Sequence, residues 1–133
     1  MKQLITLIAV ILILMPFPLQ TMNENRIHAE EATMQKIVHN AKEQAKQDGC
    51  FTAANRAALI TELASRLENV SAAEITVEAT DMTERKQRGE LIYYKVSIPI
   101  KNVVAAAKFY GIAPQDNQTV YVIENYTASE WLP

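Results

Sequence analysis

The chain has 133 residues, of which 49% are hydrophobic, and a formal net charge of −2. This length accommodates one small domain, and a mildly acidic chain lacks the basic field that binds phosphate backbones, so no nucleic-acid partner is expected. The single cysteine, Cys50, excludes an internal disulfide and a zinc site built from several thiols. We expect it to be a small buried hydrophobe, or else to pair with another chain in an oxidising compartment.

Hydrophobic residues are concentrated near the N-terminus, where 13 of the 16 residues at positions 4–19 are apolar. As a helix this stretch is about 24 Å long, or about 28 Å with residues 20–22 included. A thinned bilayer or a snorkelling Lys2 can accommodate that length. We therefore predict a membrane-anchoring helix over residues 1–22, and place in lipid or in a helical bundle the side chains of Ile5, Leu7, Ile11, Leu14 and Phe17.

Two prolines, Pro16 and Pro18, interrupt this apolar stretch. Each removes a backbone donor, so a helix that continues through them should kink or change its hydrogen-bond partners; alternatively, the prolines end a short anchor. Lys2 precedes the apolar stretch, whereas acidic residues predominate just after it. This asymmetry predicts a single-pass protein of the cell membrane with a cytoplasmic N-terminus and an extracytoplasmic C-terminal domain.

A cleaved signal peptide is the competing interpretation, because Ala29 provides the small residue that a cleavage site requires. That site lies ten residues beyond Leu19, past a charged run that is compatible with a helix. Cleavage sites normally follow the apolar region more closely. We favour a retained anchor over a cleaved signal.

Two amphipathic helices are predicted after the anchor. Apolar residues recur at three- and four-residue steps over residues 25–47, and Gly49 follows as a helix stop. Thr52 is suited to cap a second helix over residues 53–69, which should fold back on the first as an αα-hairpin.

The hydrophobic period changes to two after Ser71, which predicts strands over residues 74–81, 91–99 and 119–127. A short helix is expected over residues 101–112, ended by Gly111. We predict an α+β fold in which the apolar helix continues into a long amphipathic helix, followed by a second helix and a three-stranded antiparallel sheet with a short helix before the last strand. Residues 23–133 would form the exported domain. One face of the second strand should carry Ile92, Tyr94, Val96, Ile98 and Ile100.

No set of residues in the sequence predicts a reaction. His28 and His39 are eleven residues apart, about 16 Å along a helix, which is too far for one metal ion. Glycine-rich phosphate loops and the HExxH, GxSxG and CxxC motifs do not occur. We expect a non-enzymatic protein without a cofactor or a metal.

Two exposed features are candidates for partner contacts. Arg85, Lys86 and Arg88 fall in one predicted loop, which is either a plain solvated loop or a site for an acidic neighbour or anionic headgroups. Trp131 near the C-terminus is either an intramolecular latch over the sheet or an aromatic contact to a partner chain.

Over residues 4–46 an apolar helix, marked by Pro16 and Pro18, continues into an amphipathic half, and the rod so formed carries a small α+β head. This layout resembles pilin-like and pseudopilin-like proteins of bacteria. It is most similar to the minor, TadE-like subunits of tight-adherence pili and of related conjugation and secretion systems. The usual prepilin processing signature is absent: no glycine precedes a hydrophobic stretch with a glutamate at its fifth position.

This resemblance implies a structural or assembly subunit of an envelope appendage or secretion machine. Its N-terminal helix would pack in membrane lipid or against other pilin-like subunits, including copies of itself in a homo-oligomer. The alternative, from another class of function, is a secreted or anchored small binding domain that recognises a peptide or a small molecule.

Overall fold

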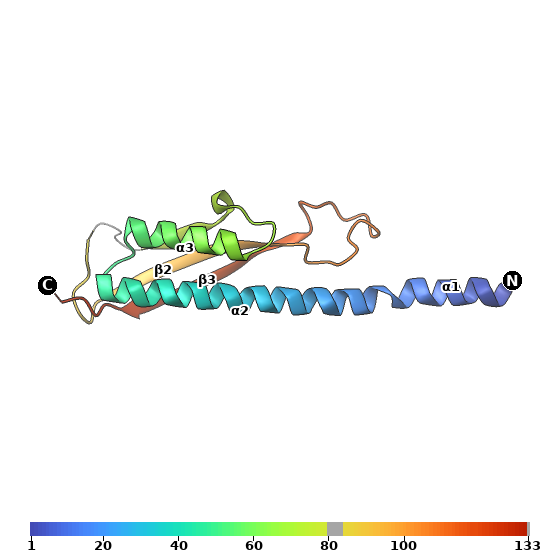
Figure 1. Ribbon diagram of the computed structural model, residues 1–133, viewed down its shortest axis with the longest axis horizontal. Helices are drawn as coiled ribbons and strands as arrows, with labels where there is room; N and C mark the ends of the chain where they lie inside the picture. The colour runs from blue at the N-terminus through green and yellow to red at the C-terminus, as the bar shows by residue number, and fades with distance from the viewer. Residues whose placement is uncertain (80–83, 133) are drawn as a thin grey trace.

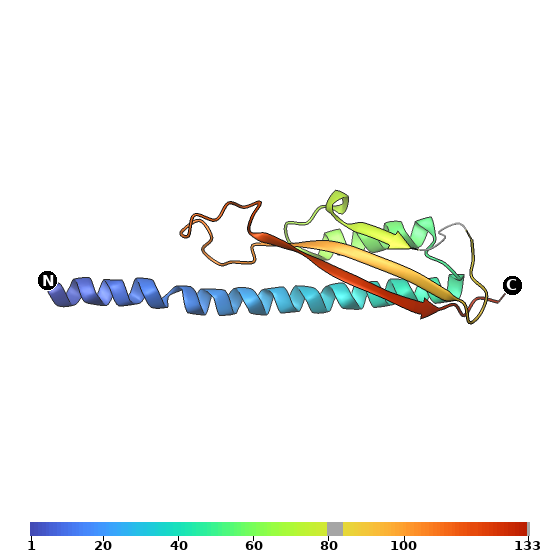
Figure 2. The same cartoon turned by 180° about the vertical axis from the view of Figure 1, so that it is seen from behind.

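The computed structural model of the protein describes residues 1–79 and 84–132. Two helices, α1 (Lys2–Leu14) and α2 (Pro16–Asp48), form a rod along the length of the molecule, and the remaining elements form a head beside the second half of α2 (Figures 1 and 2). These are α3 (Ala53–Arg66), the 3-10 helix η1 (Ala72–Glu74), β1 (Thr76–Ala79), β2 (Leu91–Lys101) and β3 (Gln118–Ala128). The predicted α+β class is confirmed.

The rod keeps its direction at the prolines (Figure 1). Met15, between α1 and α2, has helical dihedral angles (φ −59°, ψ −37°), and its N–H donates to the Ile11 carbonyl at 2.9 Å. Pro16 occupies the first position of α2, where a missing N–H is tolerated. The prolines therefore interrupt the helical hydrogen bonds only locally. The helix predicted to begin at residue 25 begins at Pro16.

The αα-hairpin forms as predicted. Gly49 caps α2 in the left-handed conformation with φ at 81°, and the Thr52 hydroxyl accepts a hydrogen bond from the Asn55 N–H at 3.1 Å. The second helix ends at Arg66 instead of residue 69, because Leu67 is extended and Asn69 is left-handed.

The sheet is antiparallel with the order β1-β2-β3, so β2 is central, and Val96 pairs with both Val77 and Ile123. The predicted inward face of β2 is confirmed: its five residues expose no more than 5% of their surface. This face packs with α2 and α3 in one core. The core includes Met34, Ile37, Val38, Phe51, Leu59 and Leu63.

The short helix lies elsewhere than the sequence predicts. Residues 101–112 continue β2 by one residue and then form consecutive turns in a loop over residues 102–117, and the only short helix within the described residues is η1, ahead of β1. Asn102 and Ala106 have φ near +57° and +55°, which an α-helix cannot contain. The strand predicted at 74–81 begins at Thr76, after η1, and its last two residues lie outside the described part of the chain.

Candidate functional site

The apolar segment is left largely uncovered by the described part of the chain. No residue of α1 is buried, and the five side chains predicted to lie in lipid or a bundle expose 52–69% of their surface. Pro16 is half-buried and Pro18 is exposed. Within the described residues one helix, counted continuously as Lys2–Asp48, is long and apolar enough to cross a membrane. This is the most conspicuous unsatisfied surface of the protein.

Hydroxyl groups in and beside this segment are satisfied by the helix itself. The Thr6 hydroxyl donates to the Lys2 carbonyl at 2.9 Å, and the Thr21 hydroxyl donates to the Phe17 carbonyl at 3.0 Å. Polar groups paired in this way can enter an apolar environment at low cost. The hydroxyl groups therefore add little to the cost of placing this segment in hydrocarbon.

Contact with the head begins at Gln20. Its amide N–H donates to the Val103 carbonyl at 3.1 Å, and its amide oxygen accepts from the Ala105 N–H at 2.9 Å. One turn later, the Asn23 amide donates to the carbonyls of Asn102 and Val103, each at 2.7 Å. These bonds hold the loop at residues 102–117 against the start of α2.

Arg26 completes this row of polar contacts. Its guanidinium donates to the carbonyls of Lys101 and Asn102 at 3.0 and 3.2 Å, and it also pairs with Glu30 at 2.8 Å. Gln20, Asn23 and Arg26, hereafter the junction residues, lie at three-residue steps on one face of α2. The predicted boundary between anchor and exported domain, after residue 22, assigns Gln20 to the anchor, whereas its side chain bonds to the head.

Sequence reasoning missed the junction residues. The signal was present as three polar side chains at helical spacing directly after an apolar segment. Their partners, however, are backbone groups about 80 positions further along the chain, and no sequence pattern identifies those.

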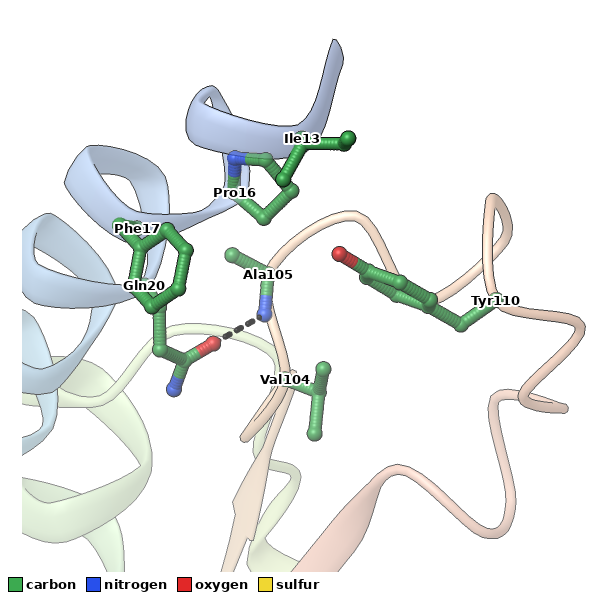
Figure 3. A pocket seen from close by; sticks show the side chains of 7 residues that line it. All are labelled: Ile13, Pro16, Phe17, Gln20, Val104, Ala105 and Tyr110. Carbon is green, nitrogen blue, oxygen red and sulfur yellow. Dashed lines mark hydrogen bonds between the residues drawn. The ribbon is translucent and has the colours of Figure 1, made fainter. Parts of the chain in front are cut away.

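An apolar cavity of about 540 Å³ separates the rod from the loop. Ile13, Pro16 and Phe17 line it on the rod side, and Tyr110 lies across from them (Figure 3). Gln20 forms its end nearest the head, where the bond to the Ala105 N–H is drawn. The loop therefore runs back from the junction residues towards the N-terminus, alongside the last turns of the apolar segment.

The predicted partner-contact residues lie at the other end of the molecule. The Arg85 guanidinium carbon is 5.5 Å from the centroid of the Trp131 ring. The Lys86 N–H donates to the Gly49 carbonyl at 2.9 Å, and the Lys86 carbonyl accepts from the Ser129 hydroxyl at 2.7 Å. The Trp131 Cβ lies beside Gly49, at the C-terminal end of α2. Arg88 is exposed. Contacts of these residues with a partner stay a prediction.

Two titratable groups mark this far end. The Lys46 ammonium lies 3.3 Å from the Glu130 carboxylate, which raises the pKa of Lys46. Burial raises the pKa of the Cys50 thiol, which exposes 2% of its surface as expected for a small core residue. The ion pair between Lys46 and Glu130 joins the C-terminal tail to the end of α2.

Clusters that could hold a metal ion are not found among the described residues. His28 faces Glu31 at 3.5 Å, within α2. Comparison of the chain with family models, with curated proteins and with solved structures finds no match. The candidate site is therefore defined by its own geometry: an uncovered apolar helix, and a loop clamped beside its end.

Proposed function

We propose that this protein is a non-enzymatic, membrane-anchored structural or assembly subunit of a bacterial envelope appendage or of a secretion or conjugation system, in the manner of a pilin-like protein. One observation carries the proposal. The first part of the rod exposes apolar side chains all around its circumference, while the same rod, further along, carries a folded head.

A helix that is apolar all around needs a non-aqueous environment. Complete removal from water stabilises each side chain of the size of Leu or Ile by about 1.5–3 kcal/mol. Because the head does not cover this part of the rod, the environment must come from outside the chain. Lipid and the helices of neighbouring subunits both supply it.

In this proposal Lys2 stays on the cytoplasmic side and the head lies outside the membrane, following the charge asymmetry around the apolar segment. The anchor then holds the protein in the membrane or in a bundle. The head selects partners through its far end, where Arg85 lies against Trp131 and the Lys86 N–H bonds to Gly49 at the end of α2, with the exposed Arg88 following in the same loop. The mechanism is packing and assembly, without a chemical step.

A small-molecule binding domain is the second candidate, favoured by the cavity of about 540 Å³, a size typical of ligand sites. Four of its seven lining residues, however, belong to the rod: Ile13, Pro16, Phe17 and Gln20. In a membrane, lipid chains would reach the same space. The anchored subunit therefore explains the cavity without a dedicated ligand.

The first test is whether the segment is retained and holds the protein in a membrane. Full-length protein from bacterial membranes should resist carbonate extraction, and its intact mass should include residues 1–29. Val10→Asp should release it, because one charge at the centre of a helix costs about 2.5–3.5 kcal/mol on insertion. Asn40→Asp, on an exposed part of α2, is the matched control and should change nothing. A mature chain that begins after Ala29 would refute the anchor.

The second test separates a subunit from a monomeric binding domain. A photo-crosslinker on Val10→Cys, in a Cys50→Ala background, should capture a second copy or another membrane protein in intact cells. Adducts with lipid alone would contradict the assembly role while leaving the anchor in place.

A further inference from the structure

We infer that the loop at residues 102–117 is a second membrane contact, with Phe109 and Tyr110 seated in the headgroup region of the outer leaflet. The protein would then hold the bilayer at two points, the apolar helix and this loop. The inference rests on the proposed anchoring, and it adds a surface and its occupant: a lipid interface.

The depth of the loop follows from its contacts with the rod. Gln20 fixes the backbone of Val103 and Ala105, and from there the loop extends towards the N-terminus until Tyr110 shares a cavity with Ile13 and Phe17 (Figure 3). In Figures 1 and 2 the loop reaches the level of the break between α1 and α2. Position 13 is six residues before the end of the apolar stretch, or about 9 Å along the helix. Membrane insertion of the apolar stretch therefore carries the loop into the outer interface.

The length of the apolar stretch strengthens this step. At about 24 Å it is shorter than a typical hydrocarbon core of about 30 Å. A short span is accommodated by thinning the bilayer or by drawing flanking groups down to it. Both responses bring the head and its loop closer to the bilayer.

The composition of the loop suits an interface. Lys108 is the only charged residue at positions 103–114. Phe109 exposes 69% of its surface and Tyr110 exposes 51%, and their rings stack edge to face at 5.4 Å. Exposed aromatic residues concentrate at headgroup depth in membrane proteins, and a neighbouring lysine can extend its ammonium towards lipid phosphates.

Backbone N–H groups in the loop are hydrogen-bonded within the loop itself, as a region with little water requires. The N–H groups of Phe109 and Tyr110 donate to the carbonyls of Ala106 and Ala107 at 2.9 and 3.1 Å, and the Ile112 N–H donates to Ala107 at 2.9 Å. Unpaired backbone groups would make insertion costly. These bonds remove much of that cost at the aromatic end.

The base of the loop is closed by Asn117, a buried polar residue with 6% exposure. Its side chain accepts from the Val104 N–H at 2.7 Å and donates to the Val104 carbonyl at 3.1 Å. Together with the bonds from Gln20, these bonds hold the base of the loop beside α2. The loop is thus positioned by the fold beside the apolar segment.

Tryptophan fluorescence in full-length protein reconstituted into phosphatidylethanolamine–phosphatidylglycerol vesicles tests the inference. Trp131, the only native tryptophan, is replaced by Phe, and one reporter is introduced at a time. Phe109→Trp reports the loop, Phe17→Trp the anchor, and Tyr126→Trp an exposed aromatic position on the sheet with 60% exposure. If the Trp131→Phe variant does not fold, Trp131 is kept as a constant background at the far end.

We expect brominated lipids to quench the Phe109→Trp and Phe17→Trp reporters, with shallow bromines more effective than deep ones at position 109. Acrylamide should quench the reporter at 109 about threefold less than the reporter at 126, as for an interfacial aromatic. A reporter at 109 that behaves like the one at 126, while the one at 17 is quenched by lipid, overturns the loop contact and leaves the anchor intact. A reporter at 17 that only acrylamide quenches refutes the anchor itself. Protection of position 109 from both quenchers would assign the loop to a protein neighbour and overturn the lipid contact.

Discussion

Two parts of the rod, the apolar segment at its start and the length of α2 beside the head, are both helical and have opposite surroundings. In α1 no side chain is buried, whereas α2 has a single buried stripe and a polar opposite face. The difference lies in the pattern around the helix and in what the rest of the chain provides. The head covers this stripe and leaves the apolar segment uncovered, which in the proposed function is the surface for lipid or for other subunits. The buried stripe consists of Met34, Ile37, Val38, Ala41 and Ala45.

An isoleucine-to-alanine substitution in each part of the rod tests this contrast most directly. Ile37→Ala should lower the free energy of unfolding of the head by about 3 kcal/mol, because Ile37 exposes only 5% of its surface and leaves a cavity. Ile11→Ala, at a position with 52% exposure, should leave head unfolding unchanged. Urea unfolding of both variants, followed by circular dichroism in detergent micelles, gives the comparison. Equal losses would show that α1 packs on the head.

A substitution at Gly49 should disrupt the packing at the C-terminal end of α2. A methyl group there would lie 2.9 Å from the Lys86 carbonyl oxygen and 3.0 Å from the Trp131 Cβ, in a left-handed conformation. Gly49→Ala should therefore destabilise the head by about 2 kcal/mol. Gly111→Ala has a positive φ of 71° but open space around it, so it should cost about 1 kcal/mol. Thermal unfolding that ranks the two variants in the reverse order would contradict the close approach at Gly49.

The boundary between the uncovered and the covered part of the rod depends on the junction residues. Asn23→Ala removes two hydrogen bonds to backbone carbonyls and should cost about 1 kcal/mol. It should also speed proteolysis of the loop at residues 102–117 in detergent. Asn40→Ala, on an exposed part of α2, is the control. Unchanged cleavage of the loop in Asn23→Ala would show that the hydrogen bonds of Asn23 do not hold the loop in place.

The smallest effect concerns acid stability of the head alone. The Lys101 ammonium at 2.7 Å and the Ser71 N–H at 2.9 Å lower the pKa of Glu74 below its usual value of 4.5. Its stabilising contribution is present above pH 4.5 and is lost as the pH falls through the pKa of the folded state. Glu74→Gln should flatten the stability profile in that acidic range, and Lys101→Met should act in the same direction. If the free energy of unfolding of wild type and of Glu74→Gln depends on pH in the same way, Glu74 does not contribute to acid stability.

Local patterns predicted the elements whose cause is local. Alternation placed the inward face of β2 correctly, and Gly49 and Thr52 marked the turn between the helices. The prediction of a helix over residues 101–112 was wrong. The alanine-rich composition of this segment favours a helix, but hydrogen bonds from Gln20 and Asn23 hold its backbone in a different conformation. Such side-chain bonds to distant backbone groups leave no period in the sequence.

Trp131 shows the same limit. An intramolecular latch was one of two alternatives, but its location next to Gly49 depends on how the link before β2 and the end of β3 meet at the end of α2. The composition of the tail contains no information about that meeting point.

The two ends of the chain lie at opposite ends of the molecule (Figure 1). β3 runs from the junction towards the far end, beside β2 with eleven registered residue pairs. In the proposed function, a pull on the end of β3 away from the membrane would load these pairs lengthwise and all together. The same tension would pass along the axis of α2 to the proposed anchor. Force along the rod would therefore act on the β2–β3 pairs in shear, instead of separating them one after another.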